Sequence, residues 1–261
     1  MADRVTVLVV DEPHLPVFDK ADATDCCEAT FEATAVRVLG RLYSDCHVFP
    51  FKELLFDWRC GWRPDIAIVD RSFAYWFIVE VEIITHSLEK HVLPQVRGLR
   101  DGEFSPGASL ELARRVGVNA DQAATLLRYV PRYTAVVANG EDTKWATALE
   151  SEEIQFLSIS SYTRDRGAPA FVVGGVLRAT QRCVGYGTVY ATDRSIRTAA
   201  GSFWVRDSYV VVDEYGKSEW SCHVSGGGVW LSKTRGTLPF RNGSPVQILS
   251  LNDDVLHIRE M

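Results

Sequence analysis

Apolar and polar positions follow two different periods in the first 160 residues of the chain. Short apolar runs typical of buried strands alternate with longer segments whose apolar residues recur every three or four positions, as on an amphipathic helix. The expected strands are a run ending at Val10, then Val48–Phe51, Ile66–Val69, Trp76–Ile84, Tyr133–Ala138 and Ile154–Ile159. The expected helices are Asp25–Tyr43, Ser87–Leu99, Ala108–Val116, Asp121–Tyr129 and Glu141–Leu149. This alternation predicts a mixed α/β domain.

Beyond residue 167 the pattern changes to short β-type runs separated by glycine-containing turns. These runs are Phe171–Val173, Cys183–Tyr190, Ser202–Val212, Val229–Leu231, Val246–Leu251 and Val255–Ile258. Their spacing is typical of a small antiparallel barrel or sandwich. We therefore expect an α/β domain over residues 1–162 and a small β-rich domain over residues 168–261, with the boundary at residues 162–167.

Two carboxylates interrupt the most apolar of the expected strands. Glu80 and Glu82 lie two positions apart, so on a strand their side chains point to the same face. Two like charges in apolar surroundings repel each other and lose solvation, and a bound divalent cation would offset that cost. Asp65, at the start of the neighbouring strand, supplies a third oxygen ligand if the two strands form a hairpin. An all-oxygen set of this kind favours Mg²⁺ or Mn²⁺.

These residues resemble the signature of the PD-(D/E)XK nuclease superfamily, a restriction-endonuclease-like mixed sheet flanked by helices. The signature is Pro-Asp, a spacer, and then Asp/Glu-x-Lys on the next strand. Pro64-Asp65 matches the first part and Glu80 matches the acidic position. Glu82 stands where the family usually has lysine, a departure that some restriction enzymes share. Lys90, further along the chain, is a candidate for a migrated lysine.

The neighbouring helices extend the resemblance over residues 25–160. Family members usually carry a metal-holding Glu on the helix before the Pro-Asp strand. Glu28 and Glu32 lie four residues apart there, and we favour Glu32. Many members also have a Gln that points back to the site from the helix after the acidic strand, and Gln95 is the candidate. Pro94 beside it lacks a backbone N–H and predicts a kink or a restart of that helix.

The resemblance implies a magnesium-dependent (or manganese-dependent) endonuclease that hydrolyses DNA phosphodiester bonds. Asp65 and Glu80 would be the main ligands, Glu32 a further ligand, and Glu82 would hold the attacking water directly or through the metal. The implied partner is double-stranded DNA, with a homodimer as a possible assembly and restriction or anti-phage defence as the setting. Two alternatives stay open: a degenerate nuclease fold that acts as a binding or assembly module, and a nuclease activated by a nucleotide bound to the β domain.

The composition of the chain adds little to the choice between these functions. The chain is 46% hydrophobic and 24% charged, ordinary values for a globular protein. The net charge of −6 argues mildly against a nucleic-acid partner, although residues from 164 onward hold 12 Lys and Arg against 9 Asp and Glu. The six cysteines include no Cys-x-x-Cys pair and are expected to be reduced. With no secretory signal and no long apolar run, we expect a cytoplasmic chain without a membrane span.

Several other residues have less specific interpretations. His86 and His91 are five positions apart rather than three or four, which disfavours a shared metal site; such histidines are more often surface or capping residues. The arginines near the site could bind phosphates but are more often solvated; they are Arg71, Arg97 and Arg100. Aromatic and basic residues interleave in the C-terminal region, which fits single-strand binding but is more often a β core with a solvated outer face. They include Trp204, Tyr209, Trp220, Trp230, Arg182, Arg194, Arg197, Arg206, Lys233 and Arg235.

Overall fold

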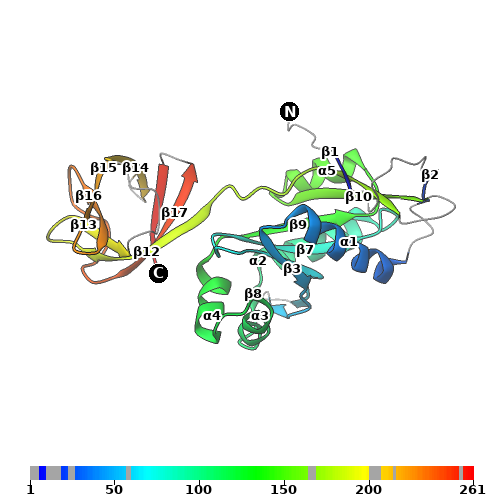
Figure 1. Ribbon diagram of the computed structural model, residues 1–261, viewed down its shortest axis with the longest axis horizontal. Helices are drawn as coiled ribbons and strands as arrows, with labels where there is room; N and C mark the ends of the chain where they lie inside the picture. Colours follow the sequence, from blue (N-terminus) through cyan, green and yellow to red (C-terminus); the bar gives the residue numbers. More distant parts are fainter. Residues whose placement is uncertain are drawn as a thin grey trace. The chain divides into compact units, whose positions relative to one another are not determined.

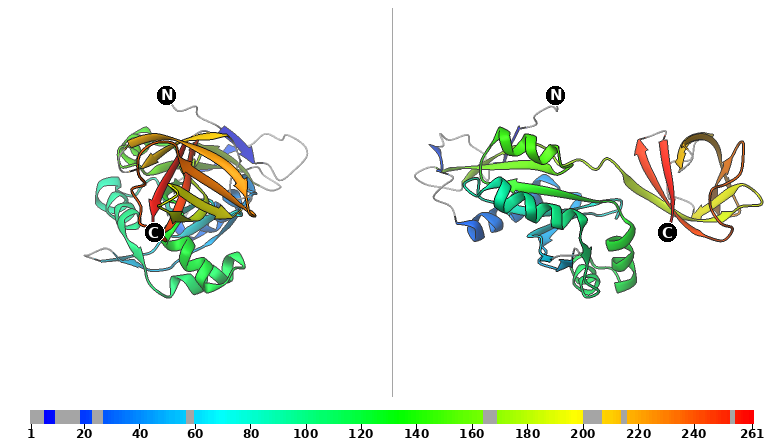
Figure 2. Two further views of the ribbon diagram at one scale, coloured as in Figure 1. Left: turned by 90° about the vertical axis from the view of Figure 1, so that its left-hand side faces the viewer. Right: turned by 180° about the vertical axis from the view of Figure 1, so that it is seen from behind.

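The computed structural model divides into two compact units, drawn in Figure 1 and from two further directions in Figure 2. It describes residues 6–9, 19–22, 27–56, 60–163, 169–199, 207–213, 216–252 and 255–261. The first unit is a mixed α/β structure and the second contains a closed β-barrel. The main chain passes from the first unit to the second between Arg178 and Ala179, which is later than the expected boundary at residues 162–167.

The main sheet of the first unit has eight strands, of which the central three are parallel. Its order is β1 (Thr6–Val9), β11 (Ala170–Gly174), β10 (Gln155–Thr163), β9 (Arg132–Ala138), β7 (Trp76–Glu82), β6 (Ile66–Asp70) and β3 (Cys46–Pro50), with β2 (Asp19–Lys20) also paired to β10. β7, β9 and β10 run parallel, and antiparallel strands border them on both sides. Because β11 pairs with both β10 and β1, it completes this sheet, which explains the later boundary.

Five α-helices and a small sheet surround the main sheet (Figure 1). The helices are α1 (Glu28–Leu42), α2 (Leu93–Asp101), α3 (Ala108–Val116), α4 (Ala120–Tyr129) and α5 (Thr143–Glu150). The small sheet consists of β5 (Gly61–Trp62), β4 (Leu55–Phe56) and β8 (Glu103–Phe104). A π-helical turn, η2 (Leu88–Val92), precedes α2, and Pro94 lies in the first turn of α2. The expected interruption near Pro94 is therefore present, as a change of helix type.

The face of the sheet that α2 and α5 cover is the face that carries the two glutamates of β7. Val136 and Ala138 of β9 are fully buried in one cluster with apolar residues of η2, α2 and α5. In the parallel register, Glu80 lies beside Val136 and Glu82 beside Ala138. Side chains paired in this way point to the same side of a sheet. The fold thus directs both carboxylates toward the layer formed by η2 and α2.

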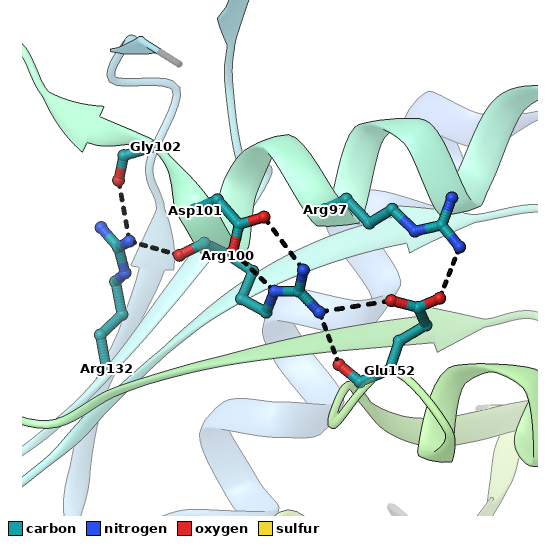
Figure 3. A network of polar contacts seen from close by, with 6 residues as sticks. All are labelled: Arg97, Arg100, Asp101, Gly102, Arg132 and Glu152. Carbon is teal, nitrogen blue, oxygen red and sulfur yellow. Dashed lines mark hydrogen bonds and ion pairs between the residues drawn. The ribbon is translucent and has the colours of Figure 1, made fainter. Parts of the chain in front are cut away.

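A network of arginines anchors the C-terminal part of α2 (Figure 3). Arg97 and Arg100 both pair with Glu152, which follows α5, and Arg100 also donates two hydrogen bonds to Asp101. Arg132 of β9 donates to the main-chain oxygens of Arg100 and Gly102, each at 2.8 Å. These oxygens lie at the helix C-terminus, where a cation is favourable. Arg97 and Arg100 are therefore engaged in holding α2 in place.

We expect Arg132→Met to lower the free energy of unfolding by about 1.5–3 kcal/mol, the range for hydrogen bonds made by charged groups. Burial lowers the pKa of Arg132 to about 10, so the guanidinium is still charged at neutral pH. Its loss leaves two helix-terminal carbonyl groups without their donor. Urea denaturation measures the change, with Arg114→Met as the control because the exposed Arg114 pairs with Glu111 on its own helix. Equal stability of the two variants would contradict this role.

The second unit holds a closed seven-stranded barrel. Its order is β12 (Arg182–Tyr190), β13 (Ser195–Ala199), β16 (Gly228–Lys233), β15 (Gly216–Ser225), β14 (Ser208–Asp213), β18 (Val255–Glu260) and β17 (Pro245–Asn252). The predicted barrel is confirmed, although β14 and β18 pair in parallel. Two strands, β13 and β15, were not expected, because polar residues hide their alternation. The predicted run Ser202–Val212 begins outside the described residues.

The aromatic residues of the barrel mostly fill its core. Tyr209 and Trp220 are buried there, and every strand of the barrel contributes at least one apolar side chain to the same core. Trp230 is half-buried, with the Tyr190 ring 5.2 Å away and the Arg197 guanidinium 5.8 Å from its ring centre. Trp204 and Arg206 lie outside the described residues. In the part of the chain that the structure describes, no helix is long and apolar enough to cross a membrane.

Candidate functional site

Asp65 and Glu80 face each other at the end of the β6–β7 hairpin. The antiparallel register pairs Ile66 with Val79, so its continuation places Asp65 opposite Glu80, and the Asp65 N–H donates to the Val79 carbonyl at 3.0 Å. The Val81 N–H donates to Asp65 Oδ2 at 2.7 Å and fixes the carboxylate. Both residues are buried, with exposed fractions of 7% and 3%. The expected hairpin is confirmed, and it brings two carboxylates together.

The two carboxylate oxygens of Glu80 differ in their hydrogen bonding. Gln95 of α2 donates a hydrogen bond to Glu80 Oε1. Glu80 Oε2 is buried and has no hydrogen-bond partner among the described residues. Burial raises the pKa of Glu80 well above its usual value, and the charges of Asp65 and Glu82 raise it further. The structure therefore contains a buried carboxylate oxygen that no described protein group satisfies.

A lysine from outside the hairpin joins this pair. Lys52 donates to Asp65 Oδ1 and, at 2.8 Å, to Glu32 Oε2 of α1. Burial alone would lower the pKa of Lys52, but its hydrogen bonds to Asp65 and Glu32 outweigh burial and raise it. Lys52 is placed by the pairing of β3 with β6, because Phe51 directly before it donates its N–H to the Asp65 carbonyl at 2.8 Å. Lys52 is thus the cation of this site.

Glu82 points to two histidines. Its Oε2 lies 2.6 Å from His86 Nδ1 and its Oε1 lies 3.4 Å from His91 Nε2. Burial raises the pKa of Glu82, while the contacts with both histidines act in the opposite direction. The charge of Glu28 on α1 also acts on Glu82. The two glutamates of α1 therefore act on different carboxylates. Glu32 is linked to Asp65 through Lys52, and the charge of Glu28 acts on Glu82.

Comparison of the chain with protein-family models, with curated proteins and with solved structures gave no match. What the site can do must therefore follow from its own residues. Asp65, Glu80 and Glu32 provide oxygen donors, the ligands that Mg²⁺ and Mn²⁺ prefer. The partnerless Oε2 of Glu80 lies in this set and is not directed at any described donor. The residues present fit a hard divalent cation.

The structure brings some of the predicted site residues together and leaves others apart. The structure brings Asp65, Glu80, Gln95 and, through Lys52, Glu32 together. Lys90 does not join them: it is exposed, and among the described residues its ammonium forms no ion pair with these carboxylates. The missed lysine, Lys52, follows the expected extended piece Val48–Phe51. Its position could have been found only by pairing that piece with the Asp65 strand.

The structure differs most from the sequence-based expectation at His86 and His91. Their five-residue spacing argued against a common ligand, yet the structure brings both to one carboxylate. The spacing rule applies to two residues within an α-helix, whereas His86 precedes the helix and His91 lies in the π-helical turn η2. Arg71, the third arginine considered as a phosphate-binding residue, donates a long hydrogen bond of 3.5 Å to the Ser44 carbonyl.

Proposed function

We propose that the chain is a metal-dependent endonuclease that hydrolyses DNA phosphodiester bonds on a restriction-endonuclease-like fold of the PD-(D/E)XK type. The observation that carries the proposal is the pairing of Asp65 and Glu80, which lie opposite each other across a hairpin with one buried oxygen unsatisfied. Such an arrangement is costly in a metal-free protein. A divalent cation bound between the carboxylates would offset that cost.

The order of elements around the pair supports the proposal. A helix with Glu32 comes first, then the β6–β7 hairpin with the carboxylates, then α2 with Gln95, and then the parallel strand β9. This is the order that the resemblance to the superfamily implies. The barrel has no assigned role in cleavage, and DNA contact through it stays a prediction.

Each residue around the pair has a definite task in this proposal. When bound, Mg²⁺ or Mn²⁺ would polarise a phosphoryl oxygen and lower the pKa of a water molecule. Asp65 and Glu80 would hold the ion, and Gln95 orients Glu80 through its hydrogen bond. Lys52 holds a positive charge beside Asp65, where it can stabilise negative charge that develops on the phosphate. Glu32 positions the Lys52 ammonium.

Lys52 also supports the second candidate function, a degenerate nuclease fold that binds a partner without cleavage. Its ammonium contacts Asp65 and Glu32 and so offsets part of their negative charge without any metal. In that case the carboxylates are a structural ion-pair network, and Glu82 at the family's lysine position marks lost activity. Ion-pair networks of this kind perturb pKa values just as catalytic sites do.

Incubation with plasmid DNA separates the two functions. We expect the purified chain to nick or linearise supercoiled plasmid in Mg²⁺ or Mn²⁺ and to leave it intact in EDTA. Single-stranded DNA and RNA of equal length, tested in parallel, define the substrate class. Binding of DNA without cleavage across both metals and all substrates would favour the degenerate fold.

A further inference from the structure

The cluster of Glu82, His86 and His91 differs chemically from the Asp65–Glu80 pair. It combines one carboxylate with two imidazoles, and one ligand atom from each residue lies within 4.8 Å of the other two. The carboxylate is 1% exposed, whereas the His86 and His91 side chains are 35% and 54% exposed. The buried acid thus forms the floor of the cluster, and the histidines leave it accessible to solvent from the other side.

We propose that Glu82, His86 and His91 form a second metal site, selective for a borderline transition ion such as Zn²⁺ over Mg²⁺. Imidazole nitrogen is a ligand for zinc and its neighbours in the first transition row, while Mg²⁺ and Ca²⁺ take oxygen ligands. Two histidines and one glutamate with an open fourth position are a known ligand set of catalytic zinc. Ion binding here does not depend on the proposed nuclease function.

The distances place the two histidine nitrogens beside different oxygens of the Glu82 carboxylate, and all three ligand atoms lie within 4.8 Å of one another. In a tetrahedral zinc site, ligand atoms at about 2.1 Å from the ion are separated from each other by about 3.4 Å. Glu82 Oε1 and His91 Nε2 are already 3.4 Å apart. Glu82 Oε2 and His86 Nδ1 are 2.6 Å apart, so a tetrahedral site would require these two atoms to move apart by about 0.8 Å. The ion would replace a hydrogen bond between acid and imidazole by two metal–ligand contacts.

Local structure explains why both imidazoles reach Glu82. β7 ends at Glu82. His86 follows in a turn, and its backbone N–H donates to the Ile83 carbonyl at 2.8 Å. Ser87 caps η2 by accepting the Lys90 N–H, and the wide π-helical turn brings His91 beside His86. The two rings meet edge to face with centres 5.1 Å apart. The nearby charge of Glu28 adds negative potential that favours a cation.

Isothermal titration of the metal-free full chain with Zn²⁺ tests the site. We expect His91→Ala and His86→Ala to weaken binding of one Zn²⁺ equivalent by at least about 10–100-fold, a loss that removal of an outer-shell partner alone can cause. His223→Ala is the matched control, because His223 is exposed in the barrel unit. Cys27→Ser is a second control, since an exposed thiol can also bind zinc. Both controls are expected to bind like wild type.

Two further measurements make the outcome decisive. Co²⁺ substituted for Zn²⁺ should give visible absorption bands of a nitrogen-ligated ion that disappear in His91→Ala, and circular dichroism checks that this variant is folded. The Asp65→Asn/Glu80→Gln variant should keep the tight Zn²⁺ equivalent, so loss of the nuclease site and loss of this site are distinguishable. Absence of tight Zn²⁺ binding by wild type, or unchanged binding by both histidine variants, overturns the proposal and leaves Glu82 as a hydrogen-bonded acid only.

Discussion

Replacing Glu80 by glutamine is expected to abolish cleavage and, in metal-free buffer, to make the protein more stable. Metal ions supply several kcal/mol of charge stabilisation in a transition state, and about 1.4 kcal/mol is worth tenfold in rate. Glu80→Gln should therefore reduce cleavage by about 10³-fold or more. Glu89→Gln is the matched control, because Glu89 is exposed on η2 and forms no ion pair with the site among the described residues.

The gain in stability follows from the burial of Glu80. The variant keeps an oxygen that accepts the Gln95 hydrogen bond, and it replaces the partnerless Oε2 by an amide that can donate to Asp65. Removing the cost of one unsatisfied buried group should add about 1–3 kcal/mol to the free energy of unfolding. Each kcal/mol raises the melting temperature of a unit of this size by about 2–4 °C.

The pH dependence of this gain has a definite sign. Burial raises the pKa of Glu80 in the folded protein above its unfolded value, so protonation stabilises the wild type as pH falls through the folded pKa. The advantage of the variant should be largest at high pH and should vanish in acid, where Glu80 is neutral. Thermal melts in EDTA across this range measure it. A variant less stable than wild type at every pH would contradict the account of Glu80 as an uncompensated acid.

Removing the Lys52 ammonium is expected to reduce cleavage by about 10²–10³-fold, the effect of deleting one group that stabilises transition-state charge. Lys52 contacts Asp65 and Glu32, and no other described lysine makes an ion pair with either carboxylate. Lys52→Met keeps most of the aliphatic stem while removing the charge. Lys90→Met is the matched control, because Lys90 is the lysine that the sequence pattern favours.

A comparison of single-turnover cleavage rates decides between the two lysines. The structure predicts that Lys52→Met is slow and that Lys90→Met is close to wild type. The reverse order would mean that the sequence pattern identified the catalytic lysine and that Lys52 only balances charge. Magnesium affinity, measured separately, distinguishes a loss of ion binding from a loss of the chemical step.

Sequence pattern was sufficient for the parts of the site that depend on local spacing. Asp65 and Glu80 lie on neighbouring strands, and the expected pairing of these strands as a hairpin brings the two residues together. Gln95 lies on the helix that directly follows, and the buried strand brings that helix over Glu80. The pairing of Asp65 with Glu80 follows from the apolar strand pattern, whereas only the resemblance to the nuclease superfamily points to Gln95.

The residues that the sequence did not place depend on long-range or unusual geometry. Lys52 reaches Asp65 because β3 pairs with β6, a contact that no local period encodes. His91 reaches Glu82 because residues 88–92 form a π-helical turn, whereas the spacing argument assumes 3.6 residues per turn. β11 belongs to the first unit because it pairs with β10, which precedes it, and with β1 at the other end of the chain, so the composition change near residue 164 precedes the structural boundary.

The most direct test of the metal-dependent nuclease is the cleavage of plasmid DNA by Asp65→Asn beside wild type in Mg²⁺ and in Mn²⁺. Asp65→Asn retains an acceptor for the Val81 N–H but loses a charged metal ligand. Asp121→Asn, an exposed substitution of the same kind on α4, is the control. We expect metal-dependent cleavage by wild type and by the control, and a loss of about 10³-fold in Asp65→Asn. Equal cleavage by all three proteins, or none by wild type with either metal, would contradict the proposed function.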